Sequence, residues 1–432
     1  MAQQKFWCGQ RKTSPLSDKG CHGVIYLIWF AEKSFWEGGR RKLRKVAVVG
    51  TGHTPFTFAT EKTSIELFSE AAMDAMNEAN LKPKDIQALY LGNCLGDFSE
   101  GQAMLQSYAA NDIGAFHIPA TRFEGACASS ALAIRDAFIW VASGYYDVVL
   151  AGGVERAASM GTPLATRTFS MFTDSHYEYP AGLTFPAIFA MLGHLYAKRY
   201  SIALEKLKEQ MALVSVQSHY YGMSNPNAQF HKEISVDDVL NGFMVSSPLQ
   251  LLDCCPFSDG AAAVVLVSEE KAKQITDKPV YITGIGQASS GKLSAQKDDL
   301  PRIRAREESA REAYNMAGIG PSDIDVCELH DCFSIASLIA AESLGLFEYG
   351  KAGEAWEKGE TKIGGKIPIN VSGGLKAKGH PIGATGAAQV TEIYHQLRGE
   401  CGERQVEGAK SGLTDTLGGD GVLCTLIMQR GW

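Results

Sequence analysis

An internal repeat constrains the fold of this chain more than any other feature of the sequence. A strand-like pattern that runs into glycines, Lys45 to Gly52, recurs at Val280 to Gly286. Each copy is followed by a helical pattern, a turn that contains proline and a second strand, at Ala71 to Leu91 and at Ala310 to Leu329. Two similar series of alternating strands and helices predict two copies of one α/β unit, packed together.

Later in each half, a turn rich in small residues leads into an apolar helix. These helices are expected at Cys127 to Val141 and at His380 to Leu397, and each is followed by a strand, Val148 to Ala151 and Val422 to Ile427. We therefore expect these two strands to correspond to one another. Glycines lie beside both strands, as the repeat requires.

The repeat also divides the chain into parts. We expect an N-terminal half at 45–154, completed by 255–275, and a C-terminal half at 276–432. Residues 155–254 have no counterpart in the second half and are expected to form an inserted loop domain, where a substrate-specific lid would lie. Residues 1–44, which are rich in aromatic and basic side chains, are expected to be an extension outside the catalytic fold.

Composition excludes several classes of protein. The 432 residues carry a net charge of −7 and no basic stripe with interleaved aromatic residues, so a nucleic-acid partner is not expected. The apolar run Val24 to Ala31 is too short to span a membrane, so a membrane anchor is disfavoured. Ten cysteines without CxxC spacing favour reduced thiols and a cytoplasmic location over a disulfide scaffold.

His380 lies on the turn that is richest in glycine. Five glycines fall within the fourteen residues from Gly373 to Gly386, and Pro381 fixes the turn just before the helix. A lone histidine is most often a structural residue of the core. Such a residue seldom needs glycines on both sides, however, so the pattern favours a functional imidazole presented at a helix start.

Cys127 is the equivalent residue of the first half. It follows a predicted strand and precedes a helix, where the helix dipole and free N–H groups stabilise a thiolate, lower its pKa and can receive an oxyanion. Free cysteines are often inert members of a core. The small flanking residues and the pairing with His380 favour a nucleophile instead.

His330 and Cys332 share a further turn between a strand and a helix. In a duplicated fold the corresponding strand ends of both halves converge, so we expect Cys127, His330, Cys332 and His380 to meet in one crevice. A zinc site made from two cysteines and two histidines is the alternative. It is disfavoured because no pair of ligands has the usual local spacing.

With these motifs in place, the chain from about Lys45 to Arg430 resembles the thiolase family, and within it the sterol-carrier-type and archaeal members. Four blocks carry the resemblance: GACASS around Cys127, Val245–Asp253 with Ser258–Val265, HDCF at 330–333 and GHPIGATG at 379–386. The resemblance implies a five-layer αβαβα thiolase fold, a homodimer or a tetramer built of dimers, and a two-step exchange of acyl groups on coenzyme A.

The resemblance also implies a role for each site residue. Cys127 would accept the acyl group, and His380 would activate it. His330 and His380 would donate to the enolate oxygen of the departing acetyl-CoA. The backbone N–H groups of Cys127 and Gly418 would bind the tetrahedral oxyanion. No metal or prosthetic group is implied, because coenzyme A is itself a substrate.

The sequence departs from the common bacterial thiolase pattern at one catalytic position. Thr416 stands where those enzymes have a second cysteine that acts as acid and base, and a threonine hydroxyl is too weak an acid for that task. The HDCF turn implies that Cys332 takes this role, as in the sterol-carrier-type relatives. Cys424 lies in a predicted strand and is expected in the core.

Substrate and partners are less constrained. Acetoacetyl-CoA and acetyl-CoA are the default expectation, and the alternative is a bulkier or aromatic 3-ketoacyl-CoA. Archaeal-type relatives often work with a small zinc-ribbon and OB-fold protein, so such a partner is a further expectation. Two rivals stay open: a thiolase-like protein that binds acyl-CoA or lipid without turnover, and a ketoacyl synthase. The four intact site residues disfavour the first, and the HDCF and GHPIGATG turns disfavour the second.

Overall fold

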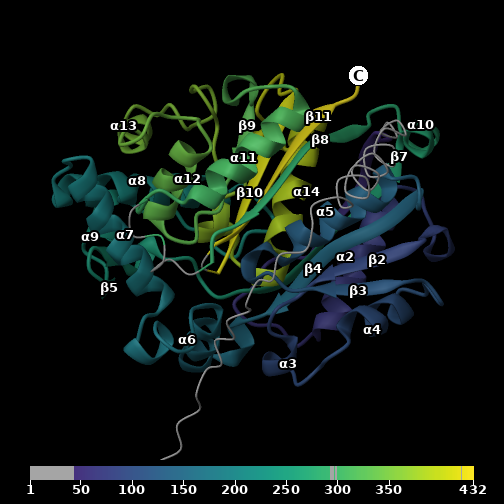
Figure 1. The fold of residues 1–432 in the computed structure, drawn as a ribbon, viewed down its shortest axis with the longest axis horizontal. Helices are drawn as coiled ribbons and strands as arrows, with labels where there is room; N and C mark the ends of the chain where they lie inside the picture. The colour runs from purple at the N-terminus through teal and green to yellow at the C-terminus, as the bar shows by residue number, and fades with distance from the viewer. Residues whose placement is uncertain (1–42, 292–295, 297–298, 420) are drawn as a thin grey trace, which may run out of the picture. The chain divides into compact units, whose positions relative to one another are not determined.

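The computed structural model describes residues 43–291, 296, 299–419 and 421–432 (Figure 1). Almost all of the predicted extension, residues 1–42, therefore lies outside the described residues. Residues 44–432 form one compact unit, which contains both repeats. Arg44 already belongs to this unit, because its backbone N–H donates to Ala142 O at 3.0 Å and its guanidinium pairs with Asp147 at 2.8 Å.

The centre of the fold is a nine-stranded mixed sheet. Its strands lie in the order β3 (Ala120–Phe123), β2 (Ala88–Gly92), β4 (Val148–Arg156), β7 (Asp259–Ser268), β1 (Val46–His53), β8 (Val280–Ser289), β11 (Val422–Arg430), β10 (Ser411–Gly418) and β9 (Val326–Glu328). The first strands of the two repeats, β1 and β8, meet in antiparallel register over three residue pairs. The sheet therefore consists of two similar halves joined at a short seam.

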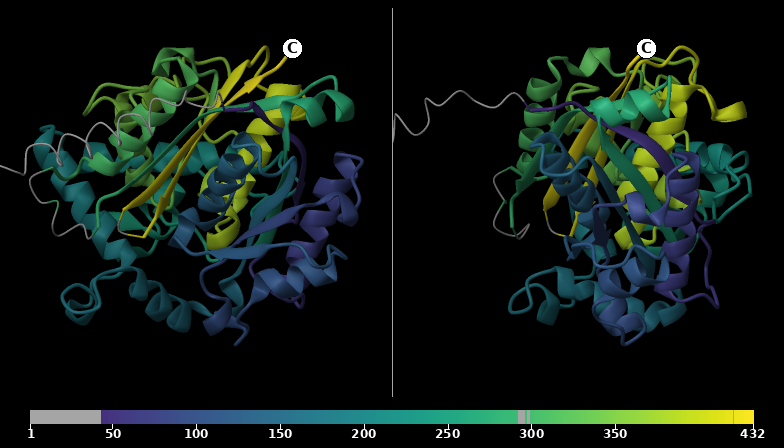
Figure 2. Two further views of the ribbon diagram at one scale, coloured as in Figure 1. Left: turned by 45° about the vertical axis from the view of Figure 1, so that its right-hand side comes forward. Right: turned by 90° about the vertical axis from the view of Figure 1, so that its right-hand side faces the viewer.

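Helices complete five layers. Helices α5 (Ser129–Ala142) and α14 (Thr385–Arg398) share one hydrophobic core with side chains from both halves of the sheet. Helix α2 (Ser64–Glu78) covers the outer face of the first half, and helices α11 (Arg304–Ala317) and α12 (Ser334–Ser343) cover that of the second. Figure 2 shows α5 and α14 between the two sets of strands. The predicted αβαβα arrangement is confirmed.

The glycines of the repeated strand pattern allow helices to approach the sheet closely. A Cβ atom at Gly52 of β1 would lie 1.9 Å from the carbonyl oxygen of Ala71 in α2. The equivalent Gly286 of β8 would place a Cβ atom 1.7 Å from the carbonyl oxygen of Ser309 in α11. Both contacts are impossible for any other residue, so the repeat in sequence reflects one strand–helix contact made twice.

One predicted correspondence between the halves is wrong. Strand β4 pairs in parallel with β2, and in the second half it is β10 that pairs in parallel with β9. The counterpart of Val148–Ala151 is therefore Ser411–Gly418 and not Val422–Ile427. The reason is chemical: β10 is fully buried but carries serine, threonine and aspartate side chains, so it lacks the apolar run that identifies a buried strand.

The insertion at 155–254 is largely helical. It contains α6 (Thr162–Phe169), α7 (Phe185–Arg199), α8 (Leu204–Gly222), α9 (Val236–Leu240) and a hairpin of β5 (Met244–Ser246) and β6 (Leu249–Gln250). Helix α8 packs against α12, α13 (Ala352–Glu357) and a π-helical turn at Gly374–Lys378. The insertion thus supports the turn that carries His380. The short helices α3 (Gly96–Ser99), α4 (Leu105–Asp112) and α10 (Glu269–Ile275) complete the fold.

Candidate active site

The start of α5 and the start of α14 bring the predicted nucleophile and its histidine together. Cys127 lies in a 3₁₀ turn, Ala126–Ala128, that runs directly into α5, and His380 lies in the turn that precedes α14. Cys127 Sγ and His380 Nε2 are 3.2 Å apart. The rings of His330 and His380 meet edge to face, with their centroids 5.1 Å apart. Residues 253 positions apart in sequence thus form one site.

Thr385 determines which nitrogen of His380 carries the proton. The Thr385 hydroxyl donates its single proton to the carbonyl oxygen of Pro381 at 3.1 Å, so its oxygen accepts from His380 Nδ1 at 2.7 Å. Nδ1 is therefore protonated, and Nε2 presents a lone pair to the Cys127 thiol. Burial lowers the pKa of His380 to about 3, so the ring is neutral at pH 7. His380 is poised to accept a proton from sulfur.

The resting state of Cys127 differs from the prediction. Burial, and then the nearby Cys332, raise the pKa of the Cys127 thiol well above its usual value, whereas the helix start was expected to lower it. Hydrogen bonds from the backbone N–H groups of Gly419 and of Cys127 itself oppose this effect but are outweighed by desolvation. The site therefore holds a neutral thiol and a neutral imidazole, and the thiolate forms only as the proton moves to His380.

The glycines at the end of β10 lie against the nucleophile. A Cβ atom at Gly418 would lie 1.9 Å from the carbonyl oxygen of Gly125 and 3.0 Å from the amide nitrogen of Ala128. This close approach explains why glycine is needed at position 418. The N–H group of the next residue, Gly419, is the one that bonds to the Cys127 sulfur. Gly419 was not predicted as a site residue, although the Gly418–Gly419 pair was a visible signal.

His330 is fixed by its backbone and leaves part of its ring free. The side chain is buried, and its backbone N–H donates to Asp415 Oδ2 at 3.4 Å. Asp415 is held in turn by Arg306 Nε at 3.0 Å. Burial, and then the neighbouring His380, lower the pKa of His330 well below its usual value, so this ring is also neutral. Within the described residues its Nδ1 has no hydrogen-bond partner, which leaves this atom available to a substrate.

The structure separates the environments of Cys332, Thr416 and Cys424. Cys332 is buried beside the site, with its carbonyl oxygen accepting from Cys255 N at 2.9 Å, and burial raises its pKa to about 12. The Thr416 hydroxyl donates to Gln389 Oε1 at 2.7 Å and is fully buried, so it serves the packing of β10 against α14. Cys424 lies in the core between the sheet and the central helices, as predicted.

A metal ion could use part of the same geometry. Ligand atoms of Cys127, His330 and His380 lie within 4.8 Å of one another, and this group has three members among the described residues. The hydrogen bond between Cys127 and His380, and the proton on His380 Nδ1, suit proton transfer between nitrogen and sulfur. The expectation that the site works without a metal stays a prediction.

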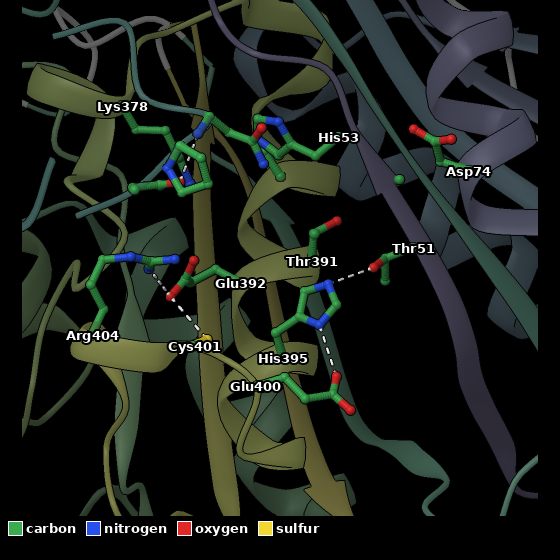
Figure 3. Close-up of a pocket in the computed structure, with 15 residues that line it drawn as sticks. Thr51, His53, Asp74, Lys378, Thr391, Glu392, His395, Glu400, Cys401 and Arg404 are labelled. Carbon is green, nitrogen blue, oxygen red and sulfur yellow. Dashed lines mark hydrogen bonds and ion pairs between the residues drawn. The ribbon is translucent and has the colours of Figure 1, made fainter. Parts of the chain in front are cut away.

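Two cavities adjoin the site. One, of about 490 Å³, is bordered by Gly125 and Ala126 of the nucleophile turn, by Gly418 and Gly419, and by Phe172 of the insertion. The other, of about 260 Å³, reaches Lys378, two residues before His380 (Figure 3). Figure 3 shows that charged residues gather around this second cavity, with Lys378 and Arg404 on one side and Glu392 between them and His395.

Comparison with known proteins gives consistent results. Residues 46–270 match the model of the thiolase N-terminal domain, and residues 286–429 match the model described as thiolase C-terminal domain-like. The chain is 44% identical to an acetyl-CoA acetyltransferase of Methanothermobacter thermautotrophicus, over 88% of this chain and 97% of that protein. It is 33% identical to sterol carrier protein 2 of Bos taurus, over 90% of this chain and 73% of that protein.

Solved structures agree. An aldolase described as Ltp2-ChsH2(DUF35) superposes with a TM-score of 0.76 at 25% identity, over 89% of this chain and 97% of the other. Among the described residues, every helix is too short or too polar to cross a lipid bilayer. All eight cysteines that the structure describes are free thiols.

Proposed function

This chain belongs to the thiolase family, and on that premise we propose that it transfers acyl groups between coenzyme A and acetyl-CoA through a thioester on Cys127. The observation that carries the proposal is the contact of 3.2 Å between Cys127 Sγ and the unprotonated Nε2 of His380. A nucleophile, a base and an orienting hydroxyl are thereby aligned in one line of hydrogen bonds.

The reaction can be followed proton by proton in the cleavage direction. The Cys127 proton moves to His380 Nε2 as sulfur attacks the 3-keto carbon of a 3-ketoacyl-CoA. The C2–C3 bond then breaks, and the enolate of acetyl-CoA leaves with its oxygen facing the two histidines. Cys332 protonates the enolate carbon. CoA next gives its thiol proton to the Cys332 thiolate and attacks the thioester, and His380 returns a proton to Cys127.

Several features of this mechanism rest on placement. Coenzyme A acts as a substrate, and the steps use no resident metal or prosthetic group. The N–H groups of Cys127 and Gly418 are proposed for the oxyanion, with Gly419 beside them. A binding protein without turnover has no need for the Thr385–His380–Cys127 alignment, which disfavours that alternative.

Acetyl-CoA and acetoacetyl-CoA are the proposed substrates, supported by the name of the archaeal relative. A bulkier 3-ketoacyl-CoA is the second candidate, because the 490 Å³ cavity beside the nucleophile turn exceeds what an acetyl group fills. The solved DUF35 aldolase complex supports a small zinc-ribbon and OB-fold protein as a partner. A homodimer or tetramer and a cytoplasmic location complete the proposal.

Mapping of the thioester tests the proposal directly. Incubation with acetyl-CoA should add an acetyl group to the peptide that contains Cys127, detected by mass spectrometry, and Cys127→Ala should abolish both the label and turnover. Label on another cysteine, or full activity in Cys127→Ala, would refute it. CoA-dependent cleavage of a panel of 3-ketoacyl-CoA substrates, with and without co-expressed zinc-ribbon proteins, then separates the two substrate classes.

A further inference from the structure

Two buried residues of opposite charge lie on the segments that carry the two histidines. Glu328, at the end of β9, precedes His330 by two residues, and Lys378 precedes His380 by two residues. Their side chains are 1% and 4% exposed, and Glu328 Oε2 lies 3.6 Å from Lys378 Nζ. The pair therefore joins two segments that are otherwise 50 positions apart in sequence, directly beside the site.

The position of the Lys378 ammonium depends on Glu328. Within the described residues, no acceptor lies within hydrogen-bond range of Lys378 Nζ. The other nearby carboxylate, Glu392, is bound by Arg404 NH1 at 2.5 Å (Figure 3). The charge of Lys378 is thus left to balance that of Glu328. In a buried setting such a charge is strongly attracted to its single partner.

Glu328 is itself fixed to the glycine-rich segment. Its carboxylate accepts from the backbone N–H of Ser372 at 3.1 Å and from the Ser372 hydroxyl at 2.5 Å. Burial raises the pKa of Glu328 to about 7, and the Lys378 ammonium is the largest influence in the opposite direction. The carboxylate thus connects the end of β9 to both ends of the segment 372–378, which leads into His380.

The proposed reaction needs this connection, because one enolate oxygen must be reached by both histidine rings. The two rings come from different segments, with centroids 5.1 Å apart and planes at 76°. Donors stabilise a developing charge only if they are held in place before it forms. A displacement of about 1 Å at such a site costs on the order of a hundredfold in rate.

We propose that Glu328 and Lys378 are positioning residues, whose ion pair holds His330 and His380 at the separation that lets both donate to the enolate oxygen. The inference rests on the proposed thiolase reaction. It assigns no contact with substrate to either residue, and it distinguishes this pair from the buried Arg306–Asp415 pair, which bonds to the His330 backbone directly.

Three variants and a rescue test the proposal. Lys378→Met, Glu328→Gln and the double variant each remove the ion pair, and Lys378→Arg keeps it. Because Glu328 can take up a proton once Lys378 is gone, the Met variant need not leave a buried charge. Tyr196→Phe is the control: it removes a buried hydrogen bond to Glu342 in the outer layer, so it lowers stability without touching the site.

The measurements are the rate at which acetyl-CoA α-protons exchange with D₂O, kcat for condensation, KM for acetyl-CoA, and Tm. We expect each single variant to lose about tenfold to a hundredfold in exchange and kcat, with KM within about threefold of the parent. The double variant should lose no more than the worse single one, because the two residues act as one unit. Lys378→Arg should recover kcat to within about threefold, and Tyr196→Phe should lower Tm alone.

Other outcomes overturn the inference. Single variants with parental kcat and a lower Tm would show that the pair serves stability only, and a parallel rise in KM would show a role in substrate binding. Losses that multiply in the double variant would show independent roles. If the single variants do not fold, the double variant decides, since full exchange in that protein contradicts the proposal. A parent protein that forms no Cys127 thioester would instead refute the proposed function.

Discussion

Thr385 shows how one hydroxyl decides the chemistry of two other side chains. Its only proton is used by the Pro381 carbonyl, so it must accept from His380, and His380 must therefore present a lone pair to Cys127. Burial keeps both partners neutral until the reaction begins. The nucleophile is thus generated by proton transfer during attack, and not stored as a thiolate.

The pH dependence of alkylation tests this neutral pair. The pKa of the Cys127 thiol is raised, so its thiolate fraction should rise with pH by about tenfold per unit across the neutral range. We expect the rate of iodoacetamide addition to the Cys127 peptide, followed by mass spectrometry, to climb without a plateau from about pH 6 to 9. A rate that is flat between pH 6 and 8 would instead indicate a thiolate–imidazolium pair and contradict the prediction.

The roles of Cys332 and Thr416 can be separated by two alanine variants. If Cys332 handles the acetyl α-proton, Cys332→Ala should still form the Cys127 thioester but lose about a hundredfold to ten-thousandfold in carbon–carbon chemistry. Thr416→Ala removes only a buried hydrogen bond to Gln389, so its activity should stay close to the parental value. Thioester yield and condensation rate are measured side by side. The assignment is wrong if the two variants exchange behaviour, or if Cys332→Ala loses both steps equally.

Sequence could identify the reacting side chains but not their supports. Cys127 and His380 follow from helix starts and small residues, and the HDCF turn carries the resemblance that marks Cys332. Thr385 has no such signal, because threonine one turn into a helix is common and its role depends on a local carbonyl. The expected pKa direction of Cys127 was wrong because desolvation depends on burial, which spacing along a chain does not report.

At the level of elements, the duplication could be predicted where packing leaves a residue signature. The glycines of β1 and β8 are such a signature, since each permits the same helix to touch the strand. Strand β10 has none, because its buried threonine and aspartate side chains are satisfied by Gln389 and Arg306 from other elements. Its partners become visible only in three dimensions, which is why the correspondence of the last strands was misjudged.

The contact between the end of β10 and the nucleophile turn gives a prediction at this scale. Gly418→Ala would press a methyl group into the Gly125 carbonyl, so β10 or the turn must shift. We expect a loss of about 1–3 kcal/mol in the free energy of unfolding and of at least about a hundredfold in kcat, because the amides around Cys127 move. Gly320→Ala is the control, since Gly320 has negative φ and meets only a side-chain oxygen at 3.7 Å. Full activity in Gly418→Ala would show that this contact does not define the site.

Across the whole molecule, the two repeats place the starts of α5 and α14 face to face. Gly386 of α14 lies so close to Ala131 of α5 that a Cβ atom there would be 2.6 Å from its amide nitrogen. Cys127 and His380 therefore meet because the duplicated halves are packed about a shared central layer. The helical insertion and the outer helices add support around this centre, and the boundaries expected for these domains stay predictions.

Shortening the chain tests how much of the N-terminal segment the catalytic fold needs. Arg44 is bound into the fold through Ala142, Val141 and Asp147, so a chain that starts at Arg41 keeps every one of these contacts. We expect that chain to be soluble, with unchanged kcat and a Tm within a few degrees of the full-length protein, as thermal unfolding and a thiolase assay would show. A chain that starts at Val46 loses the Arg44 contacts and should unfold at a lower temperature, although its site residues are intact. If the chain from Arg41 fails to fold or loses activity, the first 40 residues belong to the catalytic unit or to its oligomer interface, and the predicted boundary is wrong.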